Sequence, residues 1–428
     1  MPLLPTRHAL ITLCALIIAV CSNARAGDNF DLKLGIGYDF VSHEYFIDSA
    51  KYGLQDSSLT ISLLKKDYLN DKKALLYLSY NPGQSRHLMV ESRWEQTSDI
   101  YRALGNASLL VGNTVRNLEA GFGLEIKNRF RGPVEEGEEV AIAKGNLSYT
   151  QRLTSAVEAK VKIYAEKVDF DSTGLLVYDY SRFGGLLIAN ILTRNLDMFF
   201  ITGNLELRKV PDSTQLDYTL QRATLTYMGY VLGGRMSSEI SIEHKNYNKP
   251  AGSDDYLLGI ASVDFNAPIS PKYALKPAFY MEYFNFNTEG LLSDYLLMRG
   301  GLLLEREYGM TSVFLGPKFE TAEIMSTNTN GDDYDDDFFE YMSSVGVEFY
   351  RLSGTFLTLE NQFGRRNYLN SPLFYSDFIF DRVNLIGRLQ LTKKLGLDLL
   401  LSSEWEWHKI ESDDSRLYLF SSAIKYSF

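Results

Sequence analysis

The sequence predicts an all-β protein, a single transmembrane antiparallel β-barrel of about 20 strands (roughly 18–22) without a plug domain. Three observations lead to this prediction. The chain begins with an export signal, its polar and apolar residues alternate with period two over long segments, and its composition favours strands. Aromatic residues make up 13% of the 428 residues, with 28 Tyr and 25 Phe against 11 Pro, and Tyr and Phe prefer pleated, half-buried strands.

Residues 1–26 carry the three parts of a secretory signal peptide. A short basic region precedes an apolar run at 9–20, and Ala24 and Ala26 form an A-x-A cleavage site. The apolar run is shorter than the roughly 20 residues that a membrane-spanning helix needs. We therefore expect residues 1–26 to be removed and residues 27–428 to form the barrel.

Cysteine usage and charge exclude several classes of protein. The two cysteines of the sequence, Cys14 and Cys21, lie in the signal, so the exported chain has no disulfide, thiolate nucleophile or cysteine-based metal site. The formal net charge is −11, and the sequence has no basic run. Affinity for nucleic-acid phosphates comes from Lys and Arg, so we expect no nucleic-acid partner.

Period-two alternation is clearest in four segments, at 30–40, 118–127, 157–166 and 395–408. In each segment, apolar side chains alternate with polar residues or glycine. Because successive side chains of a strand point to opposite faces, each segment has one apolar face and one polar face. This pattern fits either a soluble antiparallel sheet or a membrane barrel.

Three features of these segments favour the membrane barrel. They run for about 12 residues, longer than the usual strand of a globular protein and long enough for a tilted membrane strand. Their polar faces carry several acids and bases each, which a wet lumen accommodates better than a dry core. Aromatic residues gather at segment ends, as at Trp405 and Trp407, where a bilayer interface favours them.

The C-terminal segment gives the most specific signal. Ile424, Tyr426 and the final residue Phe428 share one face of an alternating strand. Such a strand, ending in a terminal aromatic residue, resembles the recognition signal of porin-like outer-membrane β-barrel proteins of Gram-negative bacteria. The resemblance implies an outer-membrane location, recognition by the barrel-assembly machinery, and contact with outer-membrane lipids and lipopolysaccharide. No motif identifies a named subfamily.

The links between the predicted strands alternate in length. Counting back from the C-terminus, with both ends of the chain expected in the periplasm, assigns the longer links to the outside and the shorter ones to the inside. The outer links are 409–415, 364–373 and 326–337, and the inner links are 392–394 and 351–354. The first strand follows the signal almost directly, so we expect no plug domain.

The polar faces of the strands predict the lining of a lumen. Barrels of roughly 16–18 strands already leave an aqueous channel, so a barrel of about 20 strands is too wide for side chains to fill. Acids outnumber bases in the predicted lining, and we therefore expect a channel for ions or small solutes with a mild preference for cations. The predicted lining residues are Asp31, Lys33, Asp39, Glu119, Glu125, Lys127, Glu158, Lys160, Lys162, Glu166, Glu206, Arg208, Glu348, Arg388, Asp398, Glu404, Glu406 and Lys425.

Two other functions remain open on the sequence. One is a conduit that works with periplasmic or extracellular partners, such as an exopolysaccharide export channel or a sleeve around a multihaem electron-transfer cytochrome. The other is an outer-membrane hydrolase, in which Glu243 with His244, or Glu406 with His408, would form a His–carboxylate pair. No family motif surrounds these histidines, so we expect no catalytic residue, no cofactor and no enzymatic activity.

Two charged segments of the predicted outer rim admit two interpretations each. The acidic stretch 332–340 could bind calcium through carboxylate oxygens, but it lacks the spacing of an EF-hand loop, and we interpret it as a solvated loop without a metal. Arg365 and Arg366 could pair with lipopolysaccharide phosphates or extend to the interface as ordinary snorkelling cations. The sequence does not decide the oligomeric state.

Overall fold

The computed structural model describes most of the exported chain. The described residues are 29–49, 61–81, 86–96, 100–113, 115–131, 135–170, 178–211, 213–248, 255–286, 294–325, 337–351, 354–369, 377–409 and 414–427. The predicted signal, with Ala24 and Ala26, and the terminal Phe428 lie outside the described residues.

The regular structure of these stretches is β-strand, apart from one 3-10 turn, η1 (Thr214–Leu216). The strands are β1 (Asn29–Ser49), β2 (Ile61–Asn81), β3 (Arg86–Gln96), β4 (Ile100–Gly112), β5 (Arg116–Arg131), β6 (Glu135–Arg152), β7 (Val157–Phe170), β8 (Tyr180–Leu192), β9 (Met198–Lys209), β10 (Tyr218–Val231), β11 (Gly234–Tyr247), β12 (Tyr256–Ser270), β13 (Tyr273–Phe286), β14 (Asp294–Tyr308), β15 (Thr311–Met325), β16 (Phe338–Arg351), β17 (Thr355–Tyr368), β18 (Phe378–Gln390), β19 (Leu395–His408) and β20 (Ser415–Ser427). The predicted all-β class is confirmed. Within the part of the chain that the structure describes, no helix has the length and apolar character needed to cross a membrane.

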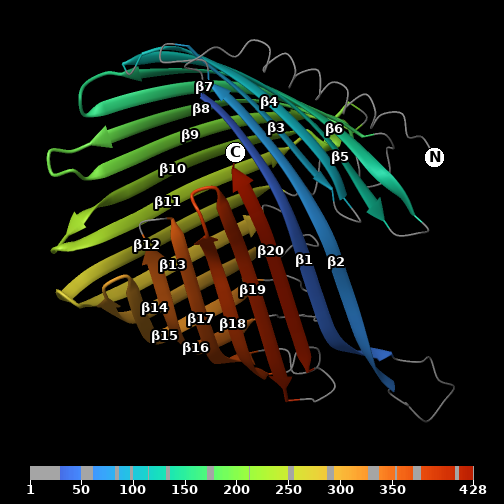
Figure 1. The fold of residues 1–428 in the computed structure, drawn as a ribbon, viewed down its shortest axis with the longest axis vertical. Coiled ribbons are helices and arrows are strands. Elements are labelled where there is room, and N and C mark those ends of the chain that lie inside the picture. The colour runs from blue at the N-terminus through green and yellow to red at the C-terminus, as the bar shows by residue number, and fades with distance from the viewer. Residues whose placement is uncertain are drawn as a thin grey trace.

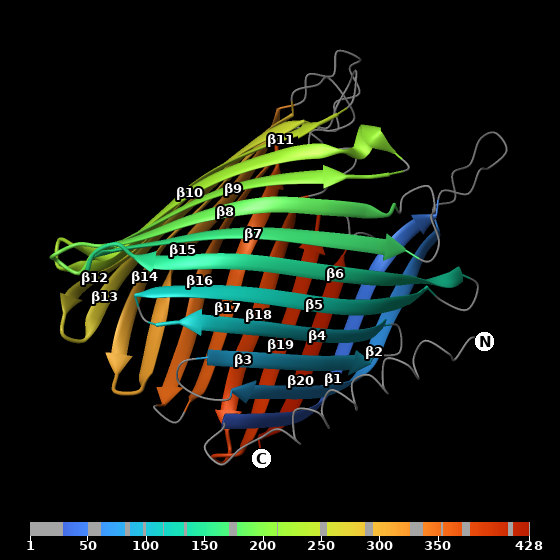
Figure 2. The ribbon, with the colours of Figure 1, turned by 90° about the horizontal axis from the view of Figure 1, so that it is seen from above.

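The strands form one 20-stranded sheet in which each strand pairs antiparallel with the next along the chain (Figure 1). The first strand also pairs with the last, from Lys33 opposite Ser427 to Tyr45 opposite Ser415, so the described ladder returns to its first strand. In Figure 2, the strands β3–β11 pass in front of β13–β20, which run in a different direction. The two groups are opposite walls of one curved sheet.

The two faces of the sheet have opposite chemistry. On β5, the outward Phe122 and Leu124 are 56% and 52% exposed, whereas the inward Glu125 is 6% exposed. On β11, Ile242 is exposed and its neighbour Glu243 is buried. Soluble proteins bury apolar side chains and expose charged ones, so this inverted arrangement is typical of a barrel in lipid.

Short and long links alternate from β6 onward, which gathers the long links of this part of the chain at one edge of the sheet, whereas the links between β2 and β6 all have three or four residues. We call this edge the long-loop rim and the opposite edge the short-turn rim. The two-residue link 232–233 between β10 and β11 lies at the short-turn rim. Leu232 and Gly233 both have positive φ, 51° and 78°, as the tight turn of a two-residue hairpin requires.

Four of the five predicted links agree closely with the strand ends. Link 326–337 lies between β15 and β16 at the long-loop rim, and link 392–394 lies between β18 and β19 at the short-turn rim. The predicted link 364–373 is wrong in its first half. Residues 364–368 continue β17 and pair with β16, and the sequence analysis ended this strand too early because Arg365 and Arg366 interrupt its apolar pattern.

Glycine on one strand positions an inward side chain of its neighbour. Tyr164 on β7 lies opposite Gly184 on β8, and a Cβ atom at Gly184 would lie 2.2 Å from Tyr164 Cζ. The phenol ring therefore lies over the glycine. From there its hydroxyl donates a hydrogen bond to Glu206 Oε2 on β9 at 2.8 Å, so a local backbone feature builds part of the inner wall.

Candidate functional site: the inner wall of the sheet

Predicted lining residues of β5 and β7 meet in ion pairs on the inner wall. Lys160 Nζ on β7 lies 3.2 Å from Glu119 Oε2 on β5. Lys144 on the intervening strand β6 lies 3.7 Å from Glu125 and 3.5 Å from Glu166. Lys144, which the sequence analysis did not identify, thus bridges two predicted lining residues, Glu125 and Glu166. Acidic and basic side chains alternate on this part of the wall.

Glu206 on β9 is the centre of a second group. The residue is 8% exposed, and its carboxylate accepts hydrogen bonds from the hydroxyls of Tyr164 at 2.8 Å and Tyr218 at 2.7 Å. Arg182 on β8 lies 3.7 Å from the same carboxylate and also pairs with Glu166. The group therefore joins four strands, β7 to β10, through one buried acid.

Arg208 and Glu158 contact aromatic or amide groups on the inner wall. The guanidinium of Arg208 lies 4.4 Å from the ring centroid of Tyr180 and 5.6 Å from that of Tyr218, distances at which a cation is attracted to an aromatic face. Its buried Nε has no hydrogen-bond partner among the described residues. Glu158 accepts a hydrogen bond from Asn190 Nδ2 at 3.3 Å.

Two predicted lining residues of the C-terminal strands pair with each other. Arg388 and Asp398 lie directly opposite across β18 and β19, and Arg388 Nε donates to Asp398 Oδ1 at 2.6 Å. Glu404 pairs with Arg382, which the sequence analysis did not identify.

A fully buried carboxylate forms the densest group of the wall. Glu340 on β16 is 0% exposed, and it lies 2.7 Å from Arg366 Nη2 and 2.8 Å from Arg382 Nη1. The two guanidinium groups stack on aromatic rings, Arg366 at 4.0 Å from Phe338 and Arg382 at 3.9 Å from Phe380. We call these five residues the Glu340 cluster.

The Glu340 cluster corrects two predictions from the sequence. Glu340 was assigned to a solvated acidic loop, but it lies in β16 and faces inward; residues 332–336 of that stretch lie outside the described residues. Arg366 was placed at the outer rim, as either a lipopolysaccharide contact or a snorkelling cation, but it pairs inward with Glu340. Its neighbour Arg365 lies on the other face, 3.4 Å from Asp377.

Neither predicted His–carboxylate pair has the arrangement of a hydrolase. Glu243 and His244 are adjacent on β11, so their side chains point to opposite faces. Glu406 Oε2 lies 3.4 Å from His408 Nε2 and accepts a hydrogen bond from Ser415 Oγ at 2.6 Å. A catalytic triad needs the histidine between the hydroxyl and the carboxylate, whereas here the carboxylate lies between the other two. In the described stretches, no group of three or more His, Cys, Asp or Glu side chains is arranged to hold a metal ion.

The remaining predicted residues fall into two groups. Lys127, Lys162 and Glu348 lie on the inward faces of β5, β7 and β16, and none of the ion pairs of the described stretches involves them. Ile424 of the C-terminal signal is 46% exposed on β20. The side chains outside the described part of the structure are those of Asp31, Lys33, Asp39, Lys425 and Tyr426.

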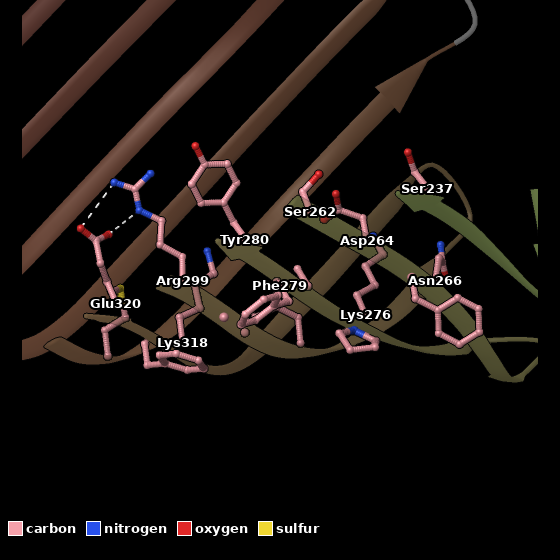
Figure 3. Close-up of a pocket in the computed structure, with 18 of the residues that line it drawn as sticks. Ser237, Ser262, Asp264, Asn266, Lys276, Phe279, Tyr280, Arg299, Lys318 and Glu320 are labelled. Carbon is pink, nitrogen blue, oxygen red and sulfur yellow. Dashed lines mark hydrogen bonds and ion pairs between the residues drawn. The ribbon is translucent and has the colours of Figure 1, made fainter. Parts of the chain in front are cut away.

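A cavity of about 860 Å³ opens where β11 to β15 curve (Figure 3). Arg299 Nε donates to Glu320 Oε2 at 2.7 Å, the contact drawn dashed in Figure 3. Lys276 Nζ lies 2.7 Å from Glu305, and Asp264 adds a further carboxylate to the lining. The volume is in the range of small-molecule sites, and the lining combines these charged groups with apolar side chains such as Phe265, Leu303 and Phe319.

The two residues missed in the Glu340 cluster could have been found by extending the period-two pattern. Glu340 shares the parity of Glu348, a predicted lining residue of the same strand. Arg382 shares the parity of Arg388 in the same way. Counting back in twos from either predicted residue reaches the missed one, because the strands run without a bulge between them.

Comparisons with known proteins give a fold and no closer relation. No protein-family model and no curated protein matches the chain. Among solved structures, the chain is similar to the siderophore receptor PirA from Pseudomonas aeruginosa, with a TM-score of 0.55 and 9% identity over 92% of this chain and 80% of that one. It is also similar to the copper transporter OprC, with a TM-score of 0.50 and 8% identity over 93% and 80% of the two chains.

A third similar structure is OccK7 of Pseudomonas aeruginosa, with a TM-score of 0.47 and 13% identity over 94% of this chain and 99% of that one. At the identities of PirA and OprC, likeness shows the fold alone. That fold is the outer-membrane β-barrel that the alternating strands and the C-terminal segment predict.

Proposed function

We propose that this outer-membrane β-barrel protein of a Gram-negative bacterium is a channel that passes ions or small polar solutes through a charged lumen. The observation that carries the proposal is the inversion of the sheet, with apolar side chains outside and ion pairs inside. Such a wall suits lipid on one side and water on the other. In the proposed barrel, the 20 strands close around a lumen without a plug, and the long-loop rim faces the cell exterior.

The proposed lumen has a mild preference for cations. Many inward acids are neutralised by a neighbouring base, as Glu119 is by Lys160. Glu282 on β13 instead accepts hydrogen bonds from the hydroxyls of Tyr280 and Tyr295. Phenols bring no positive charge, so this carboxylate keeps its own, and a charged ring or wall of that sign favours cations over anions.

Transport in this proposal is diffusion along the inner wall. The ion pairs and hydroxyls give a passing solute polar contacts in place of part of its hydration shell. The cavity beside Arg299 and Glu320 is wide enough to hold a small solute on the way. The order of Ser415, Glu406 and His408 gives no support to hydrolysis, and no catalytic step is part of the proposal.

Insertion into the membrane is proposed to use the barrel-assembly machinery. Ile424, Tyr426 and Phe428 supply the alternating C-terminal strand with a terminal aromatic residue. The outward apolar faces then contact outer-membrane lipids, with lipopolysaccharide around the long-loop rim.

Single-channel conductance and reversal potential of the refolded exported chain in a planar bilayer test this proposal. We expect steady conductance and a reversal potential, under a KCl gradient, on the cation-selective side. Glu282→Gln removes one unneutralised charge and is expected to move the reversal potential toward zero. Tyr295→Phe keeps the charge and is expected to leave it unchanged. A folded barrel without conductance contradicts the proposal.

A further inference from the structure

A row of aromatic side chains lies on the inner wall near the long-loop rim and begins at Tyr218 of the Glu206 group. The ring centroids of Tyr218 and Tyr247 are 5.7 Å apart, and those of Tyr256 and Phe284 are 4.6 Å apart. Phe284 in turn lies 5.4 Å from Tyr295 and stacks on it. The row extends over five neighbouring strands, β10 to β14. Its members are Tyr218, Tyr247, Tyr256, Phe284, Phe286 and Tyr295, and we call them the aromatic row.

The aromatic row belongs to the inner face. On β13, Phe279 has odd parity and is 42% exposed on the outer face, so the even-numbered Phe284 and Phe286 point inward. On β11, the outward Ile240 and Ile242 place Tyr247 on the inner face by the same rule. The rings are therefore separate from the aromatic side chains that face lipid.

Lys245 joins the two parts of the aromatic row. Its Nζ lies 4.2 Å from the ring centroid of Tyr218 and 4.8 Å from that of Tyr247. It also lies 5.6 Å from the ring centroid of Tyr256. Neighbouring strands lie about 4.8 Å apart, so the row follows the wall over roughly 20 Å, long enough for several linked rings of a ligand.

Carboxylates accompany the aromatic row along its length. Tyr218 donates to Glu206 at 2.7 Å, and Tyr256 donates to Glu243 Oε1 at 2.6 Å. Tyr295 donates to Glu282 in the same way. Each bond fixes the tilt of a ring. Arg182 also pairs with Glu206 and Arg222 with Glu243, whereas Glu282 with its two phenol partners keeps free acceptor sites, because an ionised carboxylate has about four lone-pair positions.

The burial of the rings argues against a purely packing role. Tyr218 is 9% exposed, but Tyr247, Tyr256, Phe284 and Tyr295 are only half-buried. Aromatic faces that stay partly open inside a polar wall match a ligand with both apolar and hydroxylated surfaces. A sugar ring has both, since its C–H groups form an apolar face and its hydroxyls lie around the edge.

We propose that the aromatic row is a binding track for neutral saccharide chains, an inference that names the solute class of the channel proposed above and rests on that proposal. The sugar faces stack on the aromatic rings, and their hydroxyls donate to Glu282. Arg182 pairs with Glu206 and Arg222 pairs with Glu243, whereas Glu282 accepts from tyrosine hydroxyls, so Glu282 is the carboxylate that repels saccharides carrying uronic acids. The track thus selects by stacking and by charge together.

The test is block of the ion current by maltohexaose, a neutral saccharide chain, through the refolded exported chain in a planar bilayer. We expect reversible block from the long-loop side, and weaker block by an oligogalacturonate of similar length. In the double variant Tyr256→Ala with Phe284→Ala, the half-blocking concentration rises at least about tenfold, since two stacking faces are lost. Leu257→Ala, at a 39% exposed side chain on the outer face of β12, is the matched control and leaves block unchanged.

Calorimetric titration of maltohexaose into the detergent-folded barrel separates this inference from the channel proposal. Conductance without saccharide block or heat of binding overturns the track and leaves the channel standing. A silent barrel that binds maltohexaose through Phe284 overturns the channel and keeps the track. Equal block by oligogalacturonate overturns the selection for neutral chains. If the double variant does not fold, Tyr247→Ala at the other end of the row replaces it, with an expected rise of about threefold.

Discussion

Two parts of the inner wall near the long-loop rim both combine a carboxylate with aromatic side chains, but they differ in how far the rings are buried. In the aromatic row, Glu282 receives hydrogen bonds from tyrosine hydroxyls and the rings of Tyr256 and Phe284 stay half-buried. In the Glu340 cluster, the carboxylate lies between Arg366 and Arg382 and is 0% exposed, as is the ring of Phe380. Both parts place an acid beside aromatic side chains, so they differ in the groups that donate hydrogen bonds to the carboxylate.

The donors decide whether the aromatic faces remain free. A guanidinium is planar and binds a carboxylate with its edge while its face stacks on a ring, and both arginines of the Glu340 cluster do this. The ring faces are then covered. A phenol donates through its own hydroxyl at the ring edge, so the bond from Tyr256 to Glu243 does not itself cover the ring face, which Lys245 Nζ approaches to 5.6 Å. The rings of the Glu340 cluster are therefore covered by guanidinium groups, whereas those of Tyr256 and Phe284 in the aromatic row are half-buried.

The largest expected effect comes from removing the charge at the centre of the Glu340 cluster. Glu340→Gln leaves Arg366 and Arg382 without their shared counter-ion in a buried site, which costs about 3–5 kcal/mol of unfolding free energy. Urea unfolding of the detergent-folded barrel, followed by tryptophan fluorescence, measures the change. A loss below about 1 kcal/mol would show that the cluster does not hold the wall.

A glycine substitution tests the packing of the same cluster. A Cβ atom at Gly364 would lie 2.5 Å from Phe380 Cζ and 2.6 Å from the backbone oxygen of Tyr341, so Gly364→Ala is expected to cost about 1–3 kcal/mol. Gly259 on β12 has no atom within 4 Å of the added Cβ, and Gly259→Ala serves as the control with little change. Unfolding midpoints in urea compare the two variants. Equal costs would remove the distinction between a packed and an open wall.

Tyr256→Phe separates ring stacking from ring orientation in the aromatic row. The change removes the hydrogen bond to Glu243 but keeps the aromatic face, so the expected loss of stability is about 1 kcal/mol. Saccharide block should weaken by less than about threefold, since stacking remains. The same current recordings measure the effect, and a loss as large as that of the double alanine variant would assign recognition to the hydroxyl.

The smallest expected effect on stability is at Glu282. In Glu282→Gln the amide oxygen still accepts a hydrogen bond from Tyr280 or Tyr295, and no cation loses its partner, so the unfolding free energy should change by less than about 1 kcal/mol. The same urea titration compares the unfolding free energies of Glu282→Gln and Glu340→Gln. A cost at Glu282 equal to that at Glu340 would contradict the role assigned to the donors.

Strand existence and side-chain parity were predictable from the sequence because membrane strands alternate in a simple way. Glu125 was predicted to face inward from the alternation in 118–127 alone, and it is 6% exposed, whereas Leu124 beside it is 52% exposed. Parity also excludes the pairing of Glu243 with His244, a consequence that the sequence analysis did not draw.

The partners of the inward charges could not be predicted in the same way. Each depends on strand register, which sets that Glu340 lies opposite Arg366, and on reach across a second strand, as from Lys160 to Glu119. The strand start at Phe338 was hidden because five aspartates precede it closely, so local composition suggested a loop where the ladder already begins. The side chains predicted on β1, among them Asp31 and Asp39, remain predictions.

The length of the first hairpin has a consequence for the cell surface. β1 and β2 each have 21 residues, whereas β20 has 13, and a tilted strand crosses the hydrocarbon core with about 9–11 residues. Roughly half of each long strand must therefore stand in water. Among the described residues, β2 meets β3 only at Leu76–Leu78, so the far part of this ribbon has an open backbone edge, a place where an approaching protein could add a strand of its own.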